Sequence, residues 1–197
     1  MEYMYFFFVA FAVLGAGLKY IDDAFDEKVF SKKIAYIIAP LLGVLWAYTM
    51  IIDAVAATIL LAILLGVLLK GKIDNIAHVI GLVVIIGVTV VAGVQLLFVP
   101  LIILAAAALL DEVGNDLVDK SSFLVGGKRW QRFVIGFFDQ RWVAKVAILG
   151  LAVVSVLPWF FFVAMMLFDG AYLGVRWFSQ IRQKALLVSP TSPGVSA

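Results

Sequence analysis

Apolar residues in this chain fall into four long runs that are separated by short charged segments. The runs cover about residues 3–18, 34–69, 76–110 and 142–177. A helix that crosses a membrane needs about 20 apolar residues, with roughly 17–25 tolerated. The first run therefore has the length of one span, and each of the other three is long enough for two, at a rise of about 1.5 Å per residue.

Each of the three longer runs contains a point at which a helix is expected to end. These points are Asp53 in the first, Gly93, Gln95 and Pro100 in the second, and Pro158 in the third. Proline in particular tends to end or kink a helix. The pattern predicts one span followed by three hairpins, which is an all-α, polytopic transmembrane helical bundle of about seven spans. Residues 1–184 would form a single transmembrane domain, and the Pro/Ser-rich residues 185–197 a disordered cytoplasmic tail.

The basic residues test this threading. All fifteen lysines and arginines fall on one side of the predicted bundle, whereas a wrong number of spans would scatter them. Because basic residues mark the cytoplasmic side, the N-terminus is predicted to lie outside and the C-terminus in the cytoplasm. The chain is therefore expected to be a multi-pass protein of the cell membrane.

Composition narrows the class further. Apolar residues make up 65% of the 197 residues and charged residues only 14%, whereas a soluble domain is about half apolar and a quarter charged. The net charge of +2 is interpreted as a basic membrane face, and no nucleic-acid partner is predicted. The absence of cysteine and the single histidine exclude disulfides, thiolate sites and a metal site built mainly from imidazoles.

Acidic residues form two groups at the predicted cytoplasmic ends of two spans. Asp22, Asp23 and Asp26 follow the first span, and a helical stripe at i, i+3, i+4 and i+7 follows the fifth. The stripe consists of Glu112, Asn115, Asp116 and Asp119. Like charges at these spacings repel one another on a helix. A divalent cation would relieve the repulsion, and Mg²⁺ prefers carboxylate oxygens together with substrate phosphates.

Two such groups facing one another could hold Mg²⁺ against a diphosphate, whose remaining charge nearby basic residues would neutralise. The basic candidates are Lys19, Lys28, Lys120, Lys128 and Arg129. The alternative is that the acidic residues only form solvated, salt-bridged helix ends.

The two acidic segments resemble the aspartate-rich motifs of the UbiA-type intramembrane prenyltransferases, which follow the pattern NDxxDxxxD and a looser DxxxD. The corresponding segments are DDAFDEK (22–28) and DEVGNDLVDK (111–120), and the second contains NDxxD at Asn115, Asp116 and Asp119. The order of spans and motifs is also similar, over about residues 3–178. The chain departs from the family where the last aspartate falls on Phe30 and Phe123, and it has fewer spans.

The resemblance implies a Mg²⁺-dependent transfer of a prenyl chain from a prenyl diphosphate to a lipid or aromatic acceptor at the cytoplasmic face. It implies metal ligation by Asp22, Asp23, Asp26, Glu112, Asp116 and Asp119, with Asp23 and Asp116 essential for catalysis. Substrate-binding candidates are Asn115, Lys19, Lys28, Lys120, Lys128, Arg129, Asp169 and Arg176. The alternative function is that of a non-enzymatic membrane protein, a small transporter or a subunit of a complex, with cation-binding acidic helix ends.

Several residues outside these motifs also carry expectations. Asp169 shares a helix face with Arg176 at i,i+7, which predicts either an ion pair or a substrate contact. His78 is interpreted as an interfacial residue, and Trp46 and Tyr48 as anchors at the outer membrane boundary. The segment 128–141 mixes basic and aromatic residues, so it is expected to be either an amphipathic helix at the membrane surface or an ordinary loop.

Overall fold

The computed structural model describes residues 2–69, 71, 75–120 and 129–188. Within these ranges the chain forms eight helices and no strand, which confirms the predicted all-α class for the described residues. The helices are α1 (Glu2–Phe25), α2 (Lys32–Ile52), α3 (Ala54–Leu69), α4 (Ile76–Ala92), α5 (Phe98–Lys120), α6 (Arg129–Asp139), α7 (Trp142–Val153) and α8 (Phe160–Val188). The remainder of the predicted tail, residues 189–197, lies outside the described residues.

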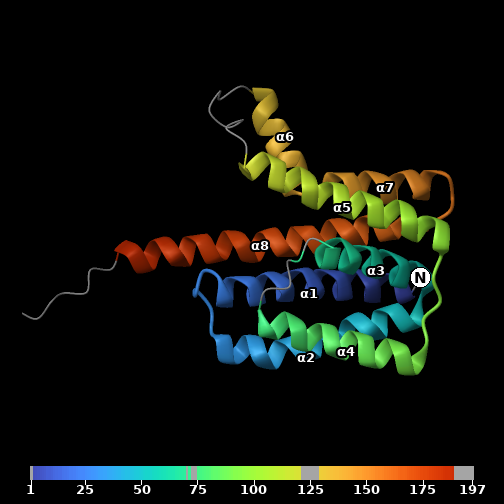
Figure 1. Cartoon of the computed structure of the whole chain (residues 1–197), viewed down its shortest axis with the longest axis horizontal. Helices are drawn as coiled ribbons and strands as arrows, with labels where there is room; N and C mark the ends of the chain where they lie inside the picture. Colours follow the sequence, from blue (N-terminus) through green and yellow to red (C-terminus); the bar gives the residue numbers. More distant parts are fainter. Residues whose placement is uncertain (1, 70, 72–74, 121–128, 189–197) are drawn as a thin grey trace, which may run out of the picture.

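The apolar helices run roughly along a common axis, whereas α6 lies crosswise to it (Figure 1). The main packing pairs are α1 with α8, α2 with α4, and α3 with α5. Helices α1 and α8 end, and helices α2 and α4 begin, on the same side of the bundle, which we call the charged end. We call the opposite side of the bundle the apolar end. At the apolar end α2 turns into α3, α4 into α5 and α7 into α8 (Figure 1).

The predicted helix breaks at Asp53, Gly93 and Pro158 are confirmed. Asp53 separates α2 from α3 because its Oδ1 accepts hydrogen bonds from the backbone N–H groups of Val55 and Ala56, both at 2.8 Å. It thus satisfies two donors that have no partner at the start of α3. Pro100 lies inside the first turn of α5 rather than in the break. Proline is tolerated there because the N–H groups of the first helical turn have no partner within the helix.

Four helices are long and apolar enough to cross a membrane: Tyr3–Phe25, Lys32–Ile52, Phe98–Leu117 and Phe160–Ala185. The three other apolar helices, α3, α4 and α7, are shorter. The shortest of them, α7, rises only about 18 Å, against about 30 Å for the hydrocarbon core of a bilayer. These lengths are compatible with a membrane protein, and four of the helices are long enough to cross a bilayer.

The outer surface of the helices is covered by large apolar side chains. The exposed fraction reaches 89% for Val91 and 74% for Phe98, and long stretches of α2, α4 and α5 expose valine, leucine and isoleucine in the same way. Water solvates such a surface poorly, and soluble monomers rarely expose large contiguous apolar patches. The interior is built mainly of aromatic and small residues, with Phe11, Phe161 and Phe168 fully buried between α1 and α8.

The α1–α8 interface depends on a small residue. A Cβ atom at Gly15 would stand 2.0 Å from the carbonyl oxygen of Phe168 in α8. Because that obstacle is backbone, it cannot rotate away as a side chain can. Small residues at helix interfaces allow this closeness in membrane proteins generally.

We therefore expect Gly15→Ala to lower the free energy of unfolding by roughly 1–3 kcal/mol, as overpacking of a core does. Gly174→Ala in α8 is the matched control, because a Cβ there meets no atom within 4 Å. That substitution should leave stability unchanged or raise it slightly, since alanine favours helix over glycine. Denaturation midpoints of both variants in detergent test the expectation, which fails if Gly15→Ala is as stable as the control.

Candidate functional site

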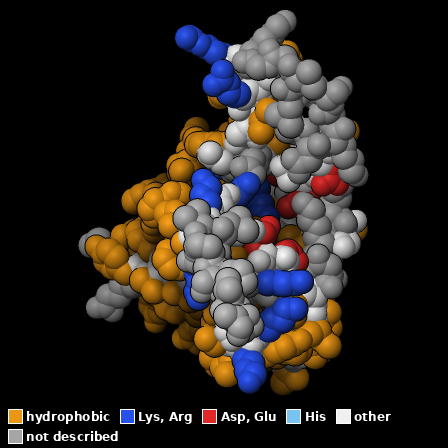
Figure 2. Space-filling model, turned by 90° about the vertical axis from the view of Figure 1, so that its left-hand side faces the viewer, with side chains coloured by type: hydrophobic (Ala, Val, Ile, Leu, Met, Phe, Trp, Pro, Cys, Tyr) orange, Lys and Arg blue, Asp and Glu red, His pale blue; other side chains and the backbone are white. Residues whose placement is uncertain are grey.

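A cavity of about 420 Å³ lies among the helices toward the charged end. Ligand pockets are commonly of this size, roughly 300–1,000 Å³. Its inner wall is apolar, with Leu42, Trp46 and Ile85 among the lining side chains. The polar lining residues are Asp22, Asp26, His78, Asp111, Glu112, Asn115, Gln140, Arg141, Asp169, Tyr172 and Arg176. Seen from the charged end, acidic side chains surround a hollow that lysines and arginines flank (Figure 2).

The first acidic group reaches the cavity through α1. Asp22 Oδ2 accepts a hydrogen bond from the Tyr172 hydroxyl at 3.2 Å, and Asp22 Oδ1 lies 3.4 Å from His78 Nε2. The His78 ring is oriented by Asn75, which caps α4 and whose Nδ2 lies 2.7 Å from His78 Nδ1. If Asn75 donates this hydrogen bond, Nε2 carries the imidazole hydrogen and directs it at Asp22. Asp26, one turn later and solvent-exposed, lines the same cavity.

The second acidic group reaches the cavity through α5. Glu112 is 5% exposed and its Oε1 lies 3.4 Å from a guanidinium nitrogen of Arg141. The adjacent Asp111 has a structural task, because its two carboxylate oxygens accept the backbone N–H groups of Val143 at 3.0 Å and Ala144 at 2.8 Å. Asp111 therefore caps α7 from a neighbouring helix, and this cap holds Arg141 at the cavity wall.

The two acidic groups meet through a short chain of contacts. Asp22 is bonded to Tyr172, the Arg141 guanidinium lies 5.5 Å from the centre of the Tyr172 ring, and Arg141 pairs with Glu112. Burial acts to lower the pKa of the Arg141 guanidinium, but the neighbouring Glu112, Tyr172 and acidic groups outweigh it and raise that pKa above its usual value. Arg141 is thus a permanent cation between the two groups.

Asp169 is paired differently from the prediction. Its Oδ2 lies 2.7 Å from Lys145 Nζ, in an ion pair that is not aligned as a hydrogen bond, and both side chains are less than 10% exposed. Lys145 also donates to the carbonyl oxygen of Gln140. The sequence predicted Arg176 as the partner because helical spacing can identify neighbours only within the same helix. The structure brings Lys145 from α7 instead, and Arg176 lines the cavity beside Asp169.

Asp23 points away from this cavity into a smaller polar one of about 370 Å³, which Asn115, Tyr172 and Arg176 line as well. Asp23 is 2% exposed, its Oδ1 pairs with Lys19 Nζ at 2.9 Å, and its Oδ2 has no hydrogen-bond partner among the described residues. The two cavities thus adjoin at three shared residues.

The other predicted site residues are scattered. Asp116 lines neither cavity, and the side chains of Asp119, Lys120 and Lys128 lie outside the described part of the structure. Lys28 is in the α1–α2 loop with a φ of 55°, and Arg129 is exposed at the start of α6. Neither is part of the lining of the two cavities.

One interpretation of a single residue was wrong: Trp46 is 4% exposed and lines the apolar part of the cavity instead of anchoring the outer boundary. His78, interpreted as an interfacial residue, lines the wall of the same cavity. The Trp46 Nε1 is buried with no hydrogen-bond partner among the described residues. Tyr48, by contrast, is 51% exposed.

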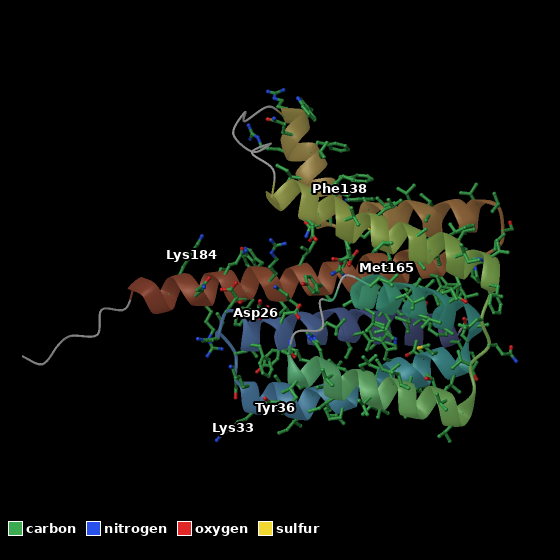
Figure 3. All side chains as sticks on the ribbon, in the orientation of Figure 1. Asp26, Lys33, Tyr36, Phe138, Met165 and Lys184 are labelled. Carbon is green, nitrogen blue, oxygen red and sulfur yellow. The ribbon has the colours of Figure 1, made fainter. Side chains whose placement is uncertain are left out.

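Tyr172 and Arg141 are cavity residues that the sequence reasoning missed. A signal existed for Tyr172, because it lies at i+3 between Asp169 and Arg176 on one stripe of α8. No pattern marked Arg141 or Lys145 as a cavity or pairing residue, since Lys145 comes from α7 and Arg141 from the segment between α6 and α7. All side chains of the site are drawn in Figure 3, where Phe138 projects from the end of α6.

Electrostatically, the cavity favours a cation or a metal-bound anion. Five carboxylates line it, from Asp22, Asp26, Asp111, Glu112 and Asp169, against two guanidiniums from Arg141 and Arg176. Oxygen donors suit Mg²⁺, which needs only one or two carboxylates when phosphates complete its shell. Among the described residues, however, no group of three or more His, Asp or Glu side chains is close enough to form a metal cage alone.

The end of α6 and the segment that joins it to α7 close one side of the cavity. Phe138, Gln140 and Arg141 all line it. The Phe138 ring rests on Gly114 of α5, where an added Cβ would stand 2.2 Å from the ring. No family model, curated protein or solved structure matches this chain.

Proposed function

We propose that the protein is a multi-pass membrane transferase that binds a prenyl diphosphate with Mg²⁺ and transfers the prenyl chain to a lipid or aromatic acceptor. One observation carries the proposal: members of both acidic groups, Asp22 and Asp26 from α1 and Glu112 and Asn115 from α5, line a single cavity whose inner wall is apolar. An amphiphile with an anionic head and an isoprenoid tail matches both parts of that wall. The resemblance of the acidic segments to the UbiA-type prenyltransferases supports the same reading.

The residues would divide the work by charge and position. Asp22, Glu112 and Asn115 would provide oxygen ligands to Mg²⁺, with Asp26 at the outer edge, and Arg141 and Arg176 would bind diphosphate oxygens. When bound, Mg²⁺ would offset the charge that develops on the diphosphate as its bond to carbon breaks. The apolar wall around Leu42 and Ile85 would hold the isoprenoid and exclude water from the reacting carbon.

The proposal includes a topology. The charged end would face the cytoplasm and the N-terminus the outside, with seven crossings formed by α1–α5, α7 and α8. The alternating directions of these helices and the charged side chains at one end support it (Figures 1 and 2). The short α7 would cross where the bilayer is locally thin or where its neighbours shield it.

The function is tested with the purified full-length protein in lipid nanodiscs. Labelled prenyl diphosphates of several chain lengths are supplied with a membrane lipid extract or with aromatic carboxylic acids. We expect the label to move to an organic-soluble product in Mg²⁺ and to remain on the diphosphate in EDTA. Absence of transfer and of diphosphate release with every donor, in the presence of Mg²⁺ or Mn²⁺, would contradict the proposal.

A non-enzymatic membrane protein with cation-binding acidic helix ends is the second candidate. It is favoured by the internal partners that the acidic residues already have, such as Lys19 for Asp23 and Arg141 for Glu112. This candidate predicts metal binding or cation flux without chemistry. Isothermal titration with Mg²⁺ alone, and then with Mg²⁺ and inorganic diphosphate, separates the two, because the transferase should bind the metal much more tightly with diphosphate present.

A further inference from the structure

Helix α6 has an aromatic side and a basic side, and most of these side chains do not line the cavity. With 3.6 residues per turn, Trp130, Phe133 and Phe137 fall on one side of Arg129–Asp139, within about 60° of arc. Arg132 lies on the other side, and Arg129 lies at the border between the two. Phe138 lies at the opposite edge of the aromatic side, where it packs on Gly114 and lines the cavity.

The rest of the aromatic side is open. Phe133 is 70% exposed and Trp130 is 53% exposed, and both arginines are exposed beside them. The Phe133 and Phe137 rings are tilted against each other at 6.1 Å between ring centres, so these two rings adjoin along the helix. Exposed aromatic rings flanked by guanidinium groups are typical of a helix that lies in the interfacial region of a membrane.

The orientation of α6 fits that location. The helix lies crosswise to the bundle axis at the charged end (Figure 1), which places its axis along a membrane surface if the bundle crosses the membrane. Its ring side chains project toward the side on which the apolar helices extend, and its nitrogen-bearing side chains project the other way (Figure 3). The exposed apolar surface of α5 and α7 begins directly below it, so the aromatic side continues the surface that lipid chains would cover.

We infer that α6 docks on an anionic lipid surface, with Trp130, Phe133 and Phe137 inserted at the level of the headgroups and Arg129 and Arg132 on lipid phosphates. Basic residues near an anionic membrane strengthen binding by roughly fivefold each. The inference depends on the proposed membrane location but not on the transferase chemistry. Docking of α6 would also tether the end of this helix and the residues that follow it to the lipid surface. This part of the chain contributes Phe138 and Arg141 to the cavity wall.

The chain contains no cysteine, so single cysteines report on one site in the full-length protein. Phe133→Cys labels the aromatic side, and Gln131→Cys is its control on the opposite side, about 160° away around the helix. Each variant carries an environment-sensitive fluorophore and is reconstituted in phosphatidylcholine vesicles with or without phosphatidylglycerol. Quenchers are a spin label on the lipid acyl chain and aqueous iodide.

We expect acyl-chain quenching at position 133 to exceed that at 131 by roughly twofold or more, with iodide showing the reverse order. Phosphatidylglycerol should increase the quenching at 133. The double substitution Arg129→Gln and Arg132→Gln should remove that increase while leaving the helical signal in circular dichroism unchanged. Equal quenching at the two positions, or no response to phosphatidylglycerol, would overturn the inference. Quenching of position 133 by a spin-labelled second copy, in place of labelled lipid, would overturn it as well and assign the aromatic side to self-association.

Discussion

Substitution of Lys145 by methionine is expected to destabilise the fold by roughly 3–5 kcal/mol, because it leaves a buried carboxylate without its counter-charge. Lys145 and Asp169 are both less than 10% exposed, and their charged atoms lie 2.7 Å apart. Methionine preserves most of the volume of lysine, so the loss arises from charge rather than from a cavity. The carbonyl oxygen of Gln140 loses its donor at the same time.

The matched double variant shows whether charge is the cause. Lys145→Met with Asp169→Leu removes both charges, and it should recover most of the lost stability, since replacing a whole buried pair by apolar residues is often neutral. Lys184→Met, at an exposed position of α8, should change little. Denaturation midpoints in detergent give all three values. A Lys145→Met protein as stable as Lys184→Met would mean that the pair does not exist in the folded protein.

Glu112→Gln and Asp22→Asn are each expected to lower Mg²⁺-dependent transfer by about a hundredfold or more, if the proposed function holds. Both substitutions keep the shape of the side chain and remove one negative charge from the cavity wall. For Asp22 the amide oxygen can still accept the Tyr172 hydroxyl, whereas His78 Nε2 loses its acceptor, so circular dichroism has to show that the helices of Asp22→Asn are retained. The loss should appear in kcat/KM, together with a higher Mg²⁺ concentration at half-maximal rate.

Asp53→Asn is the matched control for this pair. It removes the same charge at the apolar end, and asparagine caps a helix as well as aspartate does. Its transfer rate and stability should equal those of the unmodified chain. Full activity in Glu112→Gln and Asp22→Asn would remove these carboxylates from the reaction, and equal loss in the control would point to a general effect on folding.

Much of the fold could be predicted from the order of residues because lipid exposure imposes a simple rule on a helix. An apolar run must be about 20 residues long to cross, and it ends where a polar or helix-breaking residue stands. Asp53, Gly93 and Pro158 therefore located breaks that the structure confirms. Helix α6 likewise lies within the basic and aromatic segment 128–141, for which the sequence predicted either an amphipathic helix or an ordinary loop.

The acidic residues show where this reasoning stops. Helical spacing within one segment identified Asp22, Asp26, Glu112 and Asn115, and all four line the cavity. The same spacing placed Asp23 with them, but the structure turns it into the second cavity beside Lys19. A single helix carries residues on every side, and its neighbours select which of those sides encloses a cavity.

The sequence by itself determined that the chain is helical, where its apolar helices break, and that its acidic and basic residues gather toward one end, since these depend on local composition and periodicity. Only the tertiary structure decided the partners: His78 for Asp22, Arg141 for Glu112 and Lys145 for Asp169. Each of these pairs joins residues from different elements of the fold, and no periodicity along one helix encodes the packing that brings two elements together.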